Sequence, residues 1–497
     1  MSHRWDLVVL GGGTAGIVGA KVAAGFGARV LVVESERTGG DCLWTGCVPS
    51  KSLLAAAHAA AAVRRSGRFG VTAESAQVDF SAVMEHVRSA ISTIEPVDSP
   101  ESLRAAGAEV LHGFGVLTGP ATMQVTANPD EHDPRGRPVT HDVEFEQLLL
   151  ATGASPTMPP IPGLSESQPL TSETVWDVSD LPPRLAVLGG GNIGAELGQA
   201  FARLGSSVTL VEGASRLVPR EEAKAAAVLT EALQADGVVV RTGASLTAVQ
   251  PGADSGAGAL QLEDDSTVSY DRLLVAVGRS PRTGGIGLER AGVDVDERGM
   301  VVVDELLRTT NPRIWAAGDP SGHPQFTHLA GVHGSTAASN AVLGTRRKAA
   351  TTVPRVTYTD PEVAGVGLTQ DEAGLGHRTR VVEHTEVDRA VAEQRTEGYA
   401  AIVCDKHGTV LGGTVVGPRA GESLGELTLA VSKGLKTRDL AGVVHPYPTW
   451  NDGPWKAALA DVSAQLDSPL PARAIGVLTR ARSTWVRLRR TARERGR

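Results

Sequence analysis

Short apolar runs that end in glycines organise the first half of the chain. Residues 7–10 (LVVL) lead into a Gly triplet, a stretch of mostly small residues follows, and residues 28–34 (ARVLVVE) form a second apolar run that ends in Glu34. Apolar runs this short are typical of buried parallel strands, and the small residues between them predict a helix that packs closely on the strands. The order strand, glycine loop, helix and strand therefore predicts a βαβ unit.

The glycine loop of this unit has the spacing G-x-G-x-x-G, from Gly11 to Gly16. Glycines at these places let the backbone approach a pyrophosphate at the helix N-terminus, and Glu34 at the end of the next strand is placed to bind ribose hydroxyls. The glycines alone also fit a tight turn in another kind of α/β unit. The acidic residue favours a dinucleotide site.

The same pattern recurs at residues 185–212. Gly189 and Glu212 lie 23 positions apart, as do Gly11 and Glu34. Two complete fingerprints predict two Rossmann-like dinucleotide-binding domains in an α/β protein.

Glu212 also indicates which nucleotide the second domain binds. A carboxylate accepts hydrogen bonds from both ribose hydroxyls of NAD and repels the additional phosphate of NADP. Arg216 and Arg220 follow closely, so NADP(H) is the less favoured alternative to NAD(H).

Two of the three cysteines, Cys42 and Cys47, lie five positions apart before an Ala-rich helix predicted at 54–62. A helix N-terminus stabilises a thiolate, so the pair is suited to a dithiol switch. Half of a metal site or two core thiols are the alternatives. Lys51 lies one helical turn beyond Cys47 and therefore on the same face. Cys404 follows apolar residues and is interpreted as a buried strand residue without a catalytic role.

Residues 39–51 (GGDCLWTGCVPSK) resemble the active-site signature of the flavin disulfide reductases, the family of dihydrolipoamide dehydrogenase, glutathione reductase and mercuric reductase. Residues 314–319 resemble the second flavin motif of this family, and residues 417–422 and 445–452 resemble its C-terminal dimerisation domain. The resemblance covers about residues 5–468 and implies a pyridine nucleotide-disulfide oxidoreductase that forms a homodimer.

The resemblance also implies the domain plan. Residues 1–153 and 283–352 are expected to form an FAD-binding domain, split by an NAD-binding domain at 154–282, with an α+β interface domain at 353–468 and a basic tail at 469–497. The Asn-, Pro- and Gly-rich stretch at 128–139 is expected to be a hairpin loop of the first domain.

Electrons would pass from a nicotinamide nucleotide to FAD and then to a Cys42–Cys47 disulfide. In the family Cys47 is the thiol that faces the flavin, Cys42 meets the substrate, and Lys51 pairs with a glutamate, here Glu196. The FAD-binding residues that this implies are Gly11, Gly13, Thr14, Ala15, Gly16, Glu34, Gly40, Asp41, Lys51, Gly115, Thr152, Gly153, Ala154, Asp319, Gln325, Phe326, Thr327 and His328. The NAD-binding residues are Gly189, Gly191, Asn192, Ile193, Gly194, Glu196, Glu212 and Gly278.

The chain departs from the family near its C-terminus. Dihydrolipoamide dehydrogenase and glutathione reductase carry a catalytic His and a Glu where this chain has Tyr447 and Asp452. Tyrosine, with an ordinary pKa of about 10, is a poor base at neutral pH. His445 points the same way as Tyr447 if the segment is extended, so it is an alternative acid–base group. A tyrosine here resembles mercuric reductase, but this chain lacks that enzyme's C-terminal cysteine pair.

The expected activity is therefore an FAD-dependent transfer of electrons from NAD(P)H to a disulfide, a metal ion or a quinone-like acceptor. Dihydrolipoamide dehydrogenase is the alternative enzyme, and a redox-sensing protein of low turnover is the alternative of another class. No resident metal is expected.

Charge and hydropathy narrow the partners. Residues 469–497 carry nine Arg and one Glu, a charge of +8. Because the whole chain carries −8, the remaining residues carry −16, which argues against nucleic acid as a general partner. No apolar run is long enough to span a membrane, and a cytoplasmic protein is expected. Within the tail Leu478 and Trp485 share a helix face, but Arg482 interrupts the stripe. A disordered basic tail, or one that folds back on the acidic body, is favoured over peripheral contact with a membrane.

Overall fold

The computed structural model describes residues 4–74, 76–128, 139–252, 257–374 and 376–495. The chain forms two compact units: a first unit of residues 1–219 and 230–353, and a second unit of residues 220–229 and 354–497. Most of the loop expected at 128–139 lies outside the described residues.

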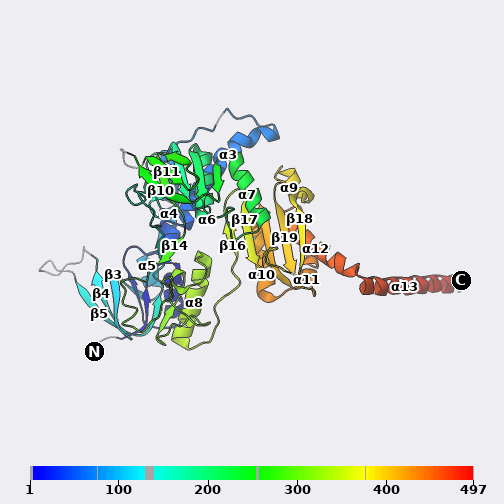
Figure 1. The fold of residues 1–497 in the computed structure, drawn as a ribbon. Helices are drawn as coiled ribbons and strands as arrows, with labels where there is room; N and C mark the ends of the chain where they lie inside the picture. The colour runs from blue at the N-terminus through cyan, green and yellow to red at the C-terminus, as the bar shows by residue number, and fades with distance from the viewer. Residues whose placement is uncertain (1–3, 75, 129–138, 253–256, 375, 496–497) are drawn as a thin grey trace. The chain divides into compact units, whose positions relative to one another are not determined.

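A parallel sheet with strand order β3-β2-β1-β5-β15 lies in the first unit (Figure 1). At one end β3, β4 and β5 continue as an antiparallel meander. The chain rejoins this sheet late, because β15 pairs with β5 after a second sheet has formed. The strands are β1 (Trp5–Leu10), β2 (Val30–Glu34), β3 (Ala108–Gly119), β4 (Thr122–Ala127), β5 (Thr140–Leu150) and β15 (Ile314–Ala316).

Helices α1 and α8 pack against each other on this sheet. They approach closely because Gly334 of α8 faces Ala15 of α1, where a Cβ on the glycine would lie 2.2 Å from the Ala15 carbonyl oxygen. Apolar side chains of β1, β2 and β5 fill the space beneath them. The helices built on this part of the chain are α1 (Thr14–Gly25), α2 (Gly40–Trp44), α3 (Cys47–Arg65), α4 (Phe80–Asp98), α5 (Pro100–Ala105) and α8 (Thr327–Leu343).

The second sheet of the first unit is parallel and has the order β13-β7-β8-β9. An antiparallel sheet, β10-β11-β12, and a pair, β14-β6, accompany it. The elements of this stretch are β6 (Ala154–Pro156), β7 (Arg184–Leu188), α6 (Asn192–Leu204), β8 (Ser207–Glu212), α7 (Ala223–Ala235), β9 (Val239–Thr242), β10 (Leu246–Pro251), β11 (Gly258–Leu262), β12 (Thr267–Tyr270), β13 (Arg272–Val275) and β14 (Arg279–Pro281). The residues of α7 up to Leu229 belong to the second unit.

The second unit is built on an antiparallel sheet with the order β16-β17-β20-β19-β18. Helix α10 packs on β17 and β20, and α12 packs on β18 and β19. Cys404 ends β19 and is fully buried, as expected. The elements are β16 (Arg355–Thr357), β17 (Glu362–Gly367), β18 (Arg378–Glu383), α9 (Asp388–Ala392), β19 (Tyr399–Cys404), β20 (Val410–Gly417), α10 (Ala420–Lys433), α11 (Thr437–Ala441), α12 (Asp452–Leu466) and α13 (Pro469–Arg495).

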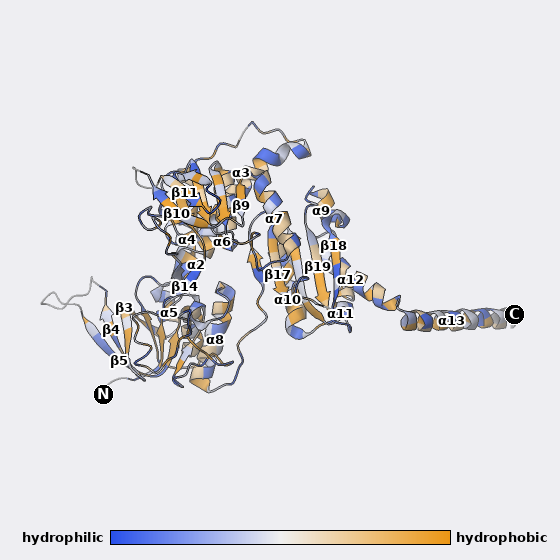
Figure 2. Cartoon of the chain, in the orientation of Figure 1, coloured by the Kyte–Doolittle hydropathy of each residue, from blue (hydrophilic) through white to orange (hydrophobic). Residues whose placement is uncertain are grey.

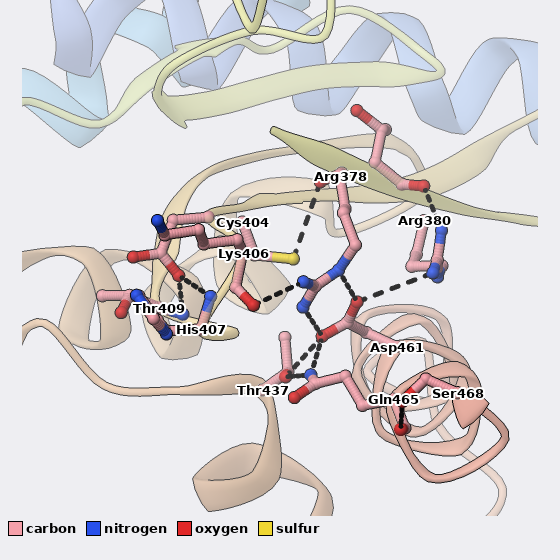
Figure 3. Close-up of polar contacts among 12 residues, drawn as sticks. Arg378, Arg380, Cys404, Lys406, His407, Thr409, Thr437, Asp461, Gln465 and Ser468 are labelled. Atoms are coloured by element: carbon pink, nitrogen blue, oxygen red, sulfur yellow. Dashed lines mark hydrogen bonds and ion pairs between the residues drawn. The ribbon is translucent and has the colours of Figure 1, made fainter. Parts of the chain in front are cut away.

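A buried carboxylate fastens α12 to the sheet. Asp461 is fully buried and accepts two hydrogen bonds from the guanidinium of Arg378 on β18, at 2.9 and 3.0 Å, while Thr437 and Gln465 also donate to it (Figure 3). Burial raises the pKa of this carboxyl, but the hydrogen bonds from Arg378, Thr437 and Gln465 outweigh it and the pKa is lowered. The charge is therefore retained inside the unit, where it joins β18, α11 and α12.

The tail is helical rather than disordered: α13 runs from Pro469 to Arg495. Hydrophilic and hydrophobic residues are mixed along this helix (Figure 2). Among the described residues, no helix is both long enough and apolar enough to cross a membrane.

His384, directly after β18, is a buried imidazole in the second unit. It is 1% exposed, neither ring nitrogen has a hydrogen-bond partner among the described residues, and its ring centroid lies 5.4 Å from that of Trp450. Burial disfavours the imidazolium and lowers the pKa of His384 to about 4, although Glu397 and Glu383 oppose this shift. The second unit therefore folds with this histidine neutral.

We predict that His384 weakens the fold at low pH. The unfolded chain binds a proton here at about pH 6.5 and the folded chain only at about pH 4, so stability is retained above pH 6.5 and lost as pH falls toward 4. The loss from this group is roughly 3 kcal/mol. His384→Leu should flatten the acid limb of a plot of unfolding midpoint against pH, measured by circular dichroism.

The exposed His407 provides the matched control. His407→Leu should keep the acid limb of the wild type. An acid limb of unchanged steepness in His384→Leu would contradict the assignment.

Candidate active site

The first glycine loop brings the start of α1 against the end of β1. Gly11 has a φ of +107°, and a Cβ on Gly16 would lie 1.9 Å from the Gly11 carbonyl oxygen, so only glycine fits at either place. Gly13 caps α1 and supplies no side-chain cap. The start of α1 therefore has the glycine loop and the N–H groups without a side-chain cap that are typical of a site for a pyrophosphate.

Glu34 closes this loop from the end of β2. Its carboxylate accepts hydrogen bonds from the N–H groups of Gly12, at 2.5 Å, and Glu36, at 2.7 Å. Burial raises the pKa of Glu34, and the two N–H donors act in the opposite direction. The carboxylate is thus held beside the glycine loop by both of its oxygens.

The second loop repeats this geometry. Gly189 also has a φ of +107°, and a Cβ on Gly194 would again lie 1.9 Å from the carbonyl oxygen of the first glycine. Glu212, at the end of β8, accepts from Gly190 at 2.6 Å and from Ala214 at 2.7 Å. Gly191 caps α6, and Asn192 and Ile193 lie in its first turn. The equal spacing in the sequence thus corresponds to equal backbone geometry.

Two buried polar atoms near the first loop indicate space for a ligand. Thr152, directly after β5, and Gln325, directly before α8, each bury a side-chain polar atom that has no partner among the described residues. Burying such an atom costs free energy unless a bound group forms a hydrogen bond with it. Gly153 and Ala154 follow Thr152, and Phe326, Thr327 and His328 follow Gln325, with the rings of Phe326 and His328 stacked at 5.3 Å. These residues fit a bound flavin nucleotide.

An arginine that the sequence analysis missed joins two of the expected FAD residues. Arg279, the first residue of β14, is paired with Asp41 and lies 3.6 Å from Asp319. It also donates to the Ala154 carbonyl at 2.5 Å. Burial raises the pKa of Asp319, and Arg279 opposes this shift. The only sequence signal was its place directly after Gly278.

The two thiols meet at the start of α3. Cys42 lies in α2, Cys47 is the first residue of α3, and both are partly buried free thiols. The Cys47 sulfur is hydrogen-bonded to Cys42 and lies 3.2 Å from the Thr327 hydroxyl. The hydrogen bond from Cys42 is the main cause that lowers the pKa of Cys47 to about 6, with Thr327 and Lys51 adding to it against burial.

Cys42 shows the opposite behaviour. Its hydrogen bond to Cys47 and its burial raise the pKa of the Cys42 thiol. The reduced pair therefore holds one proton, on Cys42, and a thiolate on Cys47 at neutral pH.

Lys51 forms the expected ion pair with Glu196. Lys51 Nζ lies 2.8 Å from Glu196 Oε2, and the glutamate side chain is only 6% exposed. Because Glu196 belongs to α6, the pair ties the dithiol helix α3 to the helix of the second glycine loop. At the far end of α3, Arg65 forms a second ion pair, with Asp236, the residue that follows α7; the nitrogen and oxygen atoms lie 2.5 Å apart.

His445 and Tyr447 were expected to point the same way only if their segment is extended, and this condition is not met. Residues 445–449 do not form a strand, so the alternation on which the expectation rested does not apply. The His445 side chain is 7% exposed; Nε2 lies 2.9 Å from Glu426 and Nδ1 lies 3.0 Å from the Val443 carbonyl oxygen. Tyr447 is 67% exposed and donates its hydroxyl hydrogen to Asp388.

Neither candidate base is free in this arrangement. Both nitrogens of His445 face oxygen acceptors, which leaves no lone pair directed at a substrate. The hydrogen bond to Asp388 raises the pKa of Tyr447. Asp452, the third candidate, is 1% exposed at the first position of α12. Glu426 and Asp388 carried no signal in the sequence, since they lie 19 and 59 positions from their partners.

The remaining residues expected to bind cofactors lie in or next to strands and helices of the first unit. Gly115 lies in β3, where a Cβ would meet Met123 and Leu10. Gly40 lies in α2, and Gly278 follows β13 with open space around it. Thr14 and Ala15 begin α1.

The chain matches the family model described as pyridine nucleotide-disulphide oxidoreductase over residues 5–334 and the model of its dimerisation domain over residues 353–458. It is 38% identical to a mercuric reductase of Streptomyces lividans, over 90% of this chain and 94% of that protein. It is 35% identical to a dihydrolipoyl dehydrogenase of Thermus scotoductus, over 92% and 97%.

Solved structures give the same result. LpdA from Mycobacterium tuberculosis matches with a TM-score of 0.82 at 28% identity, over 92% of this chain and 99% of that one. The Cu(II) complex of the HOCl-induced flavoprotein disulfide reductase RclA from Escherichia coli matches with a TM-score of 0.80 at 25% identity, over 92% and 99%.

These comparisons confirm the predicted fold class, the family resemblance and the expectation of an enzyme. The dimerisation domain supports the expected homodimer. With two glycine loops, a dithiol at a helix start and matches that span most of its length, the chain belongs to the pyridine nucleotide-disulphide oxidoreductases, which use FAD and NAD(P)H.

Proposed function

We propose that the chain oxidises NADH and passes the electron pair through Cys42 and Cys47 to an acceptor that requires no acid–base group, with a soft metal ion such as Hg(II) preferred over the disulfide lipoamide. The observation that carries this proposal is the engagement of both candidate bases: His445 by Glu426 and the Val443 carbonyl, and Tyr447 by Asp388. Reduction of lipoamide expels a thiolate that an acid must protonate, and in the reverse reaction the same group must deprotonate the dithiol, whereas a metal ion must only meet a thiolate.

FAD, when bound, accepts hydride from NADH and delivers electrons in a pair, chemistry that no side chain supplies. The first glycine loop and Glu34 are proposed to hold its pyrophosphate and ribose. Thr152, Gln325 and Asp319 are proposed to meet its remaining polar groups, since two of them bury polar atoms without partners. Arg279 would fix Asp41 and Asp319 in place.

The cysteine pair receives two electrons and one proton, which converts the disulfide to a Cys42 thiol and a Cys47 thiolate. The proton stays on Cys42, whose thiol pKa is raised, and Lys51 stabilises the charge on Cys47. For a mercuric ion the balanced reaction is NADH plus Hg²⁺ giving NAD⁺, H⁺ and metallic mercury. Because the chain has only three cysteines, Cys42 and Cys47 would bind the metal themselves.

NADH is proposed as the donor rather than NADPH. Glu212 is fixed beside the second glycine loop by Gly190 and Ala214, where a carboxylate repels the 2′-phosphate of NADPH.

The partner subunit is proposed to complete the site. Val443 and Val444, next to His445, are 54% and 96% exposed, as is typical of side chains that pairing of subunits covers. The relatives named above are a mercuric reductase and a dihydrolipoyl dehydrogenase, and the panel of acceptors below separates these two activities.

We predict that a panel of acceptors separates the candidates. Steady-state oxidation of NADH and of NADPH should be fastest with NADH and Hg(II), in the presence of excess thiol, and at least roughly tenfold slower with lipoamide. Cys42→Ser should remove the metal-dependent rate. Turnover no faster than the oxygen background with every acceptor would favour a redox sensor, and a faster rate with lipoamide would contradict the preference for metal.

We predict that the reduced dithiol has a spectroscopic signature. Anaerobic addition of one equivalent of NADH should give a long-wavelength absorbance from the Cys47 thiolate beside the flavin, and it should fade as pH falls through about 6. Cys47→Ser should lack the band, and Cys42→Ser should show it without NADH. A spectrum that passes directly to fully reduced flavin would rule out the dithiol pathway.

We predict that Tyr447→His raises dihydrolipoamide oxidation at pH 7, by roughly tenfold or more, because it supplies a base with an ordinary pKa near neutrality. Tyr447→Phe should leave the low rate unchanged, since the tyrosine is no base. His445→Gln should also leave it unchanged. Loss of the residual activity in His445→Gln would instead identify His445 as the base.

A further inference from the structure

The C-terminal helix α13 carries an apolar stripe with an 11-residue repeat. Leu470, Ala481 and Ala492 repeat at this interval, as do Ala474 with Trp485 and Val477 with Leu488. Eleven residues complete slightly more than three turns of an α-helix, so the stripe stays almost straight along α13. The stripe is formed by Leu470, Ala474, Val477, Leu478, Ala481, Trp485, Leu488 and Ala492.

Arg482 does not interrupt this stripe, contrary to the expectation from the sequence. The stripe passes from Leu478 to Trp485 by way of Ala481, and Arg482 lies at its border. The guanidinium carbons of Arg482 and Arg489 lie 4.3 and 4.1 Å from the ring centroid of Trp485. The two arginines therefore flank the indole, with their charges at the edge of the apolar surface.

The stripe is exposed over its whole length. The exposed fractions are 77% for Leu470, 65% for Val477, 68% for Leu478 and 65% for Leu488. A single exposed leucine needs no explanation, but a continuous line of apolar side chains over more than twenty residues marks a binding surface.

The charge of α13 indicates which kind of partner binds the stripe. From Ser468 to Arg493 the chain has no acidic residue, and six arginines precede Arg493 in the helix. A second copy of α13 would bring these like charges together without acidic partners at the flanks. A nucleic acid would bind the arginines and leave the apolar stripe in water. An anionic lipid surface meets both the stripe and the arginines.

We infer that α13 docks on an anionic phospholipid bilayer. The helix lies in the plane of the headgroups, the stripe enters the boundary of the acyl chains, and the arginines contact lipid phosphates. The inference rests on the tail alone and is independent of the acceptor proposed above.

The test is co-sedimentation of the full-length FAD-loaded enzyme with vesicles. We expect binding to vesicles of phosphatidylglycerol and phosphatidylcholine at low salt, no binding to phosphatidylcholine alone, and release at ~0.5 M salt. Leu478→Glu with Trp485→Glu should weaken binding by more than roughly tenfold. NADH oxidation in solution should stay unchanged in this variant.

Thr479→Glu with Ser483→Glu is the matched control, because it introduces the same charges on the opposite face of the helix. It should bind vesicles more tightly than the stripe variant. An equal loss of vesicle binding in the two variants would show that net charge alone determines binding, and would overturn docking through the stripe.

Failure of the wild type to bind anionic vesicles would also overturn the inference. In that case, binding to duplex DNA that survives in the stripe variant would assign the tail to nucleic acid. A sedimentation coefficient that falls only in the stripe variant would assign it to a second copy of the chain.

Discussion

The negative charge on the Cys47 sulfur is the constraint on which the rest of the first unit depends. A thiolate that is largely removed from water must be stabilised by its neighbours. The structure supplies this stabilisation from three parts of the chain: Cys42 five residues earlier, Thr327 at the start of α8, and Lys51 one turn along α3. Because Thr327 lies 280 positions from Cys47, α3 and α8 must be held in register, and the close packing of α8 on α1 contributes to that.

The same constraint explains why α3 is fastened at both ends. Lys51 near its start pairs with Glu196, and Arg65 at its end pairs with Asp236. Glu196 is itself on the helix that begins at the second glycine loop. The dithiol helix and the second nucleotide-binding segment are therefore joined by charges that are costly to separate, since the buried carboxylate would lose its partner.

The sequence predicted what depends on local spacing. The two glycine loops, the acidic residues at the ends of β2 and β8, and the position of Lys51 on the face of Cys47 all follow from short-range geometry. Arg279 and Glu426 did not follow, because their partners lie 238 and 19 positions away and meet only in the folded chain. The relative orientation of His445 and Tyr447 did not follow either, because the expectation held only for an extended strand and residues 445–449 do not form one.

The presence of α13 in each subunit has a consequence for a protein that carries a dimerisation domain. A homodimer bears two such helices, and if both reach one bilayer, binding of the first gives the second a high effective concentration at the surface. Two weak contacts with the bilayer then give the dimer a higher overall affinity than one tail has, while each single tail can still dissociate. A subunit exchange that separated the dimer would release the enzyme from the surface without any change in the tail itself.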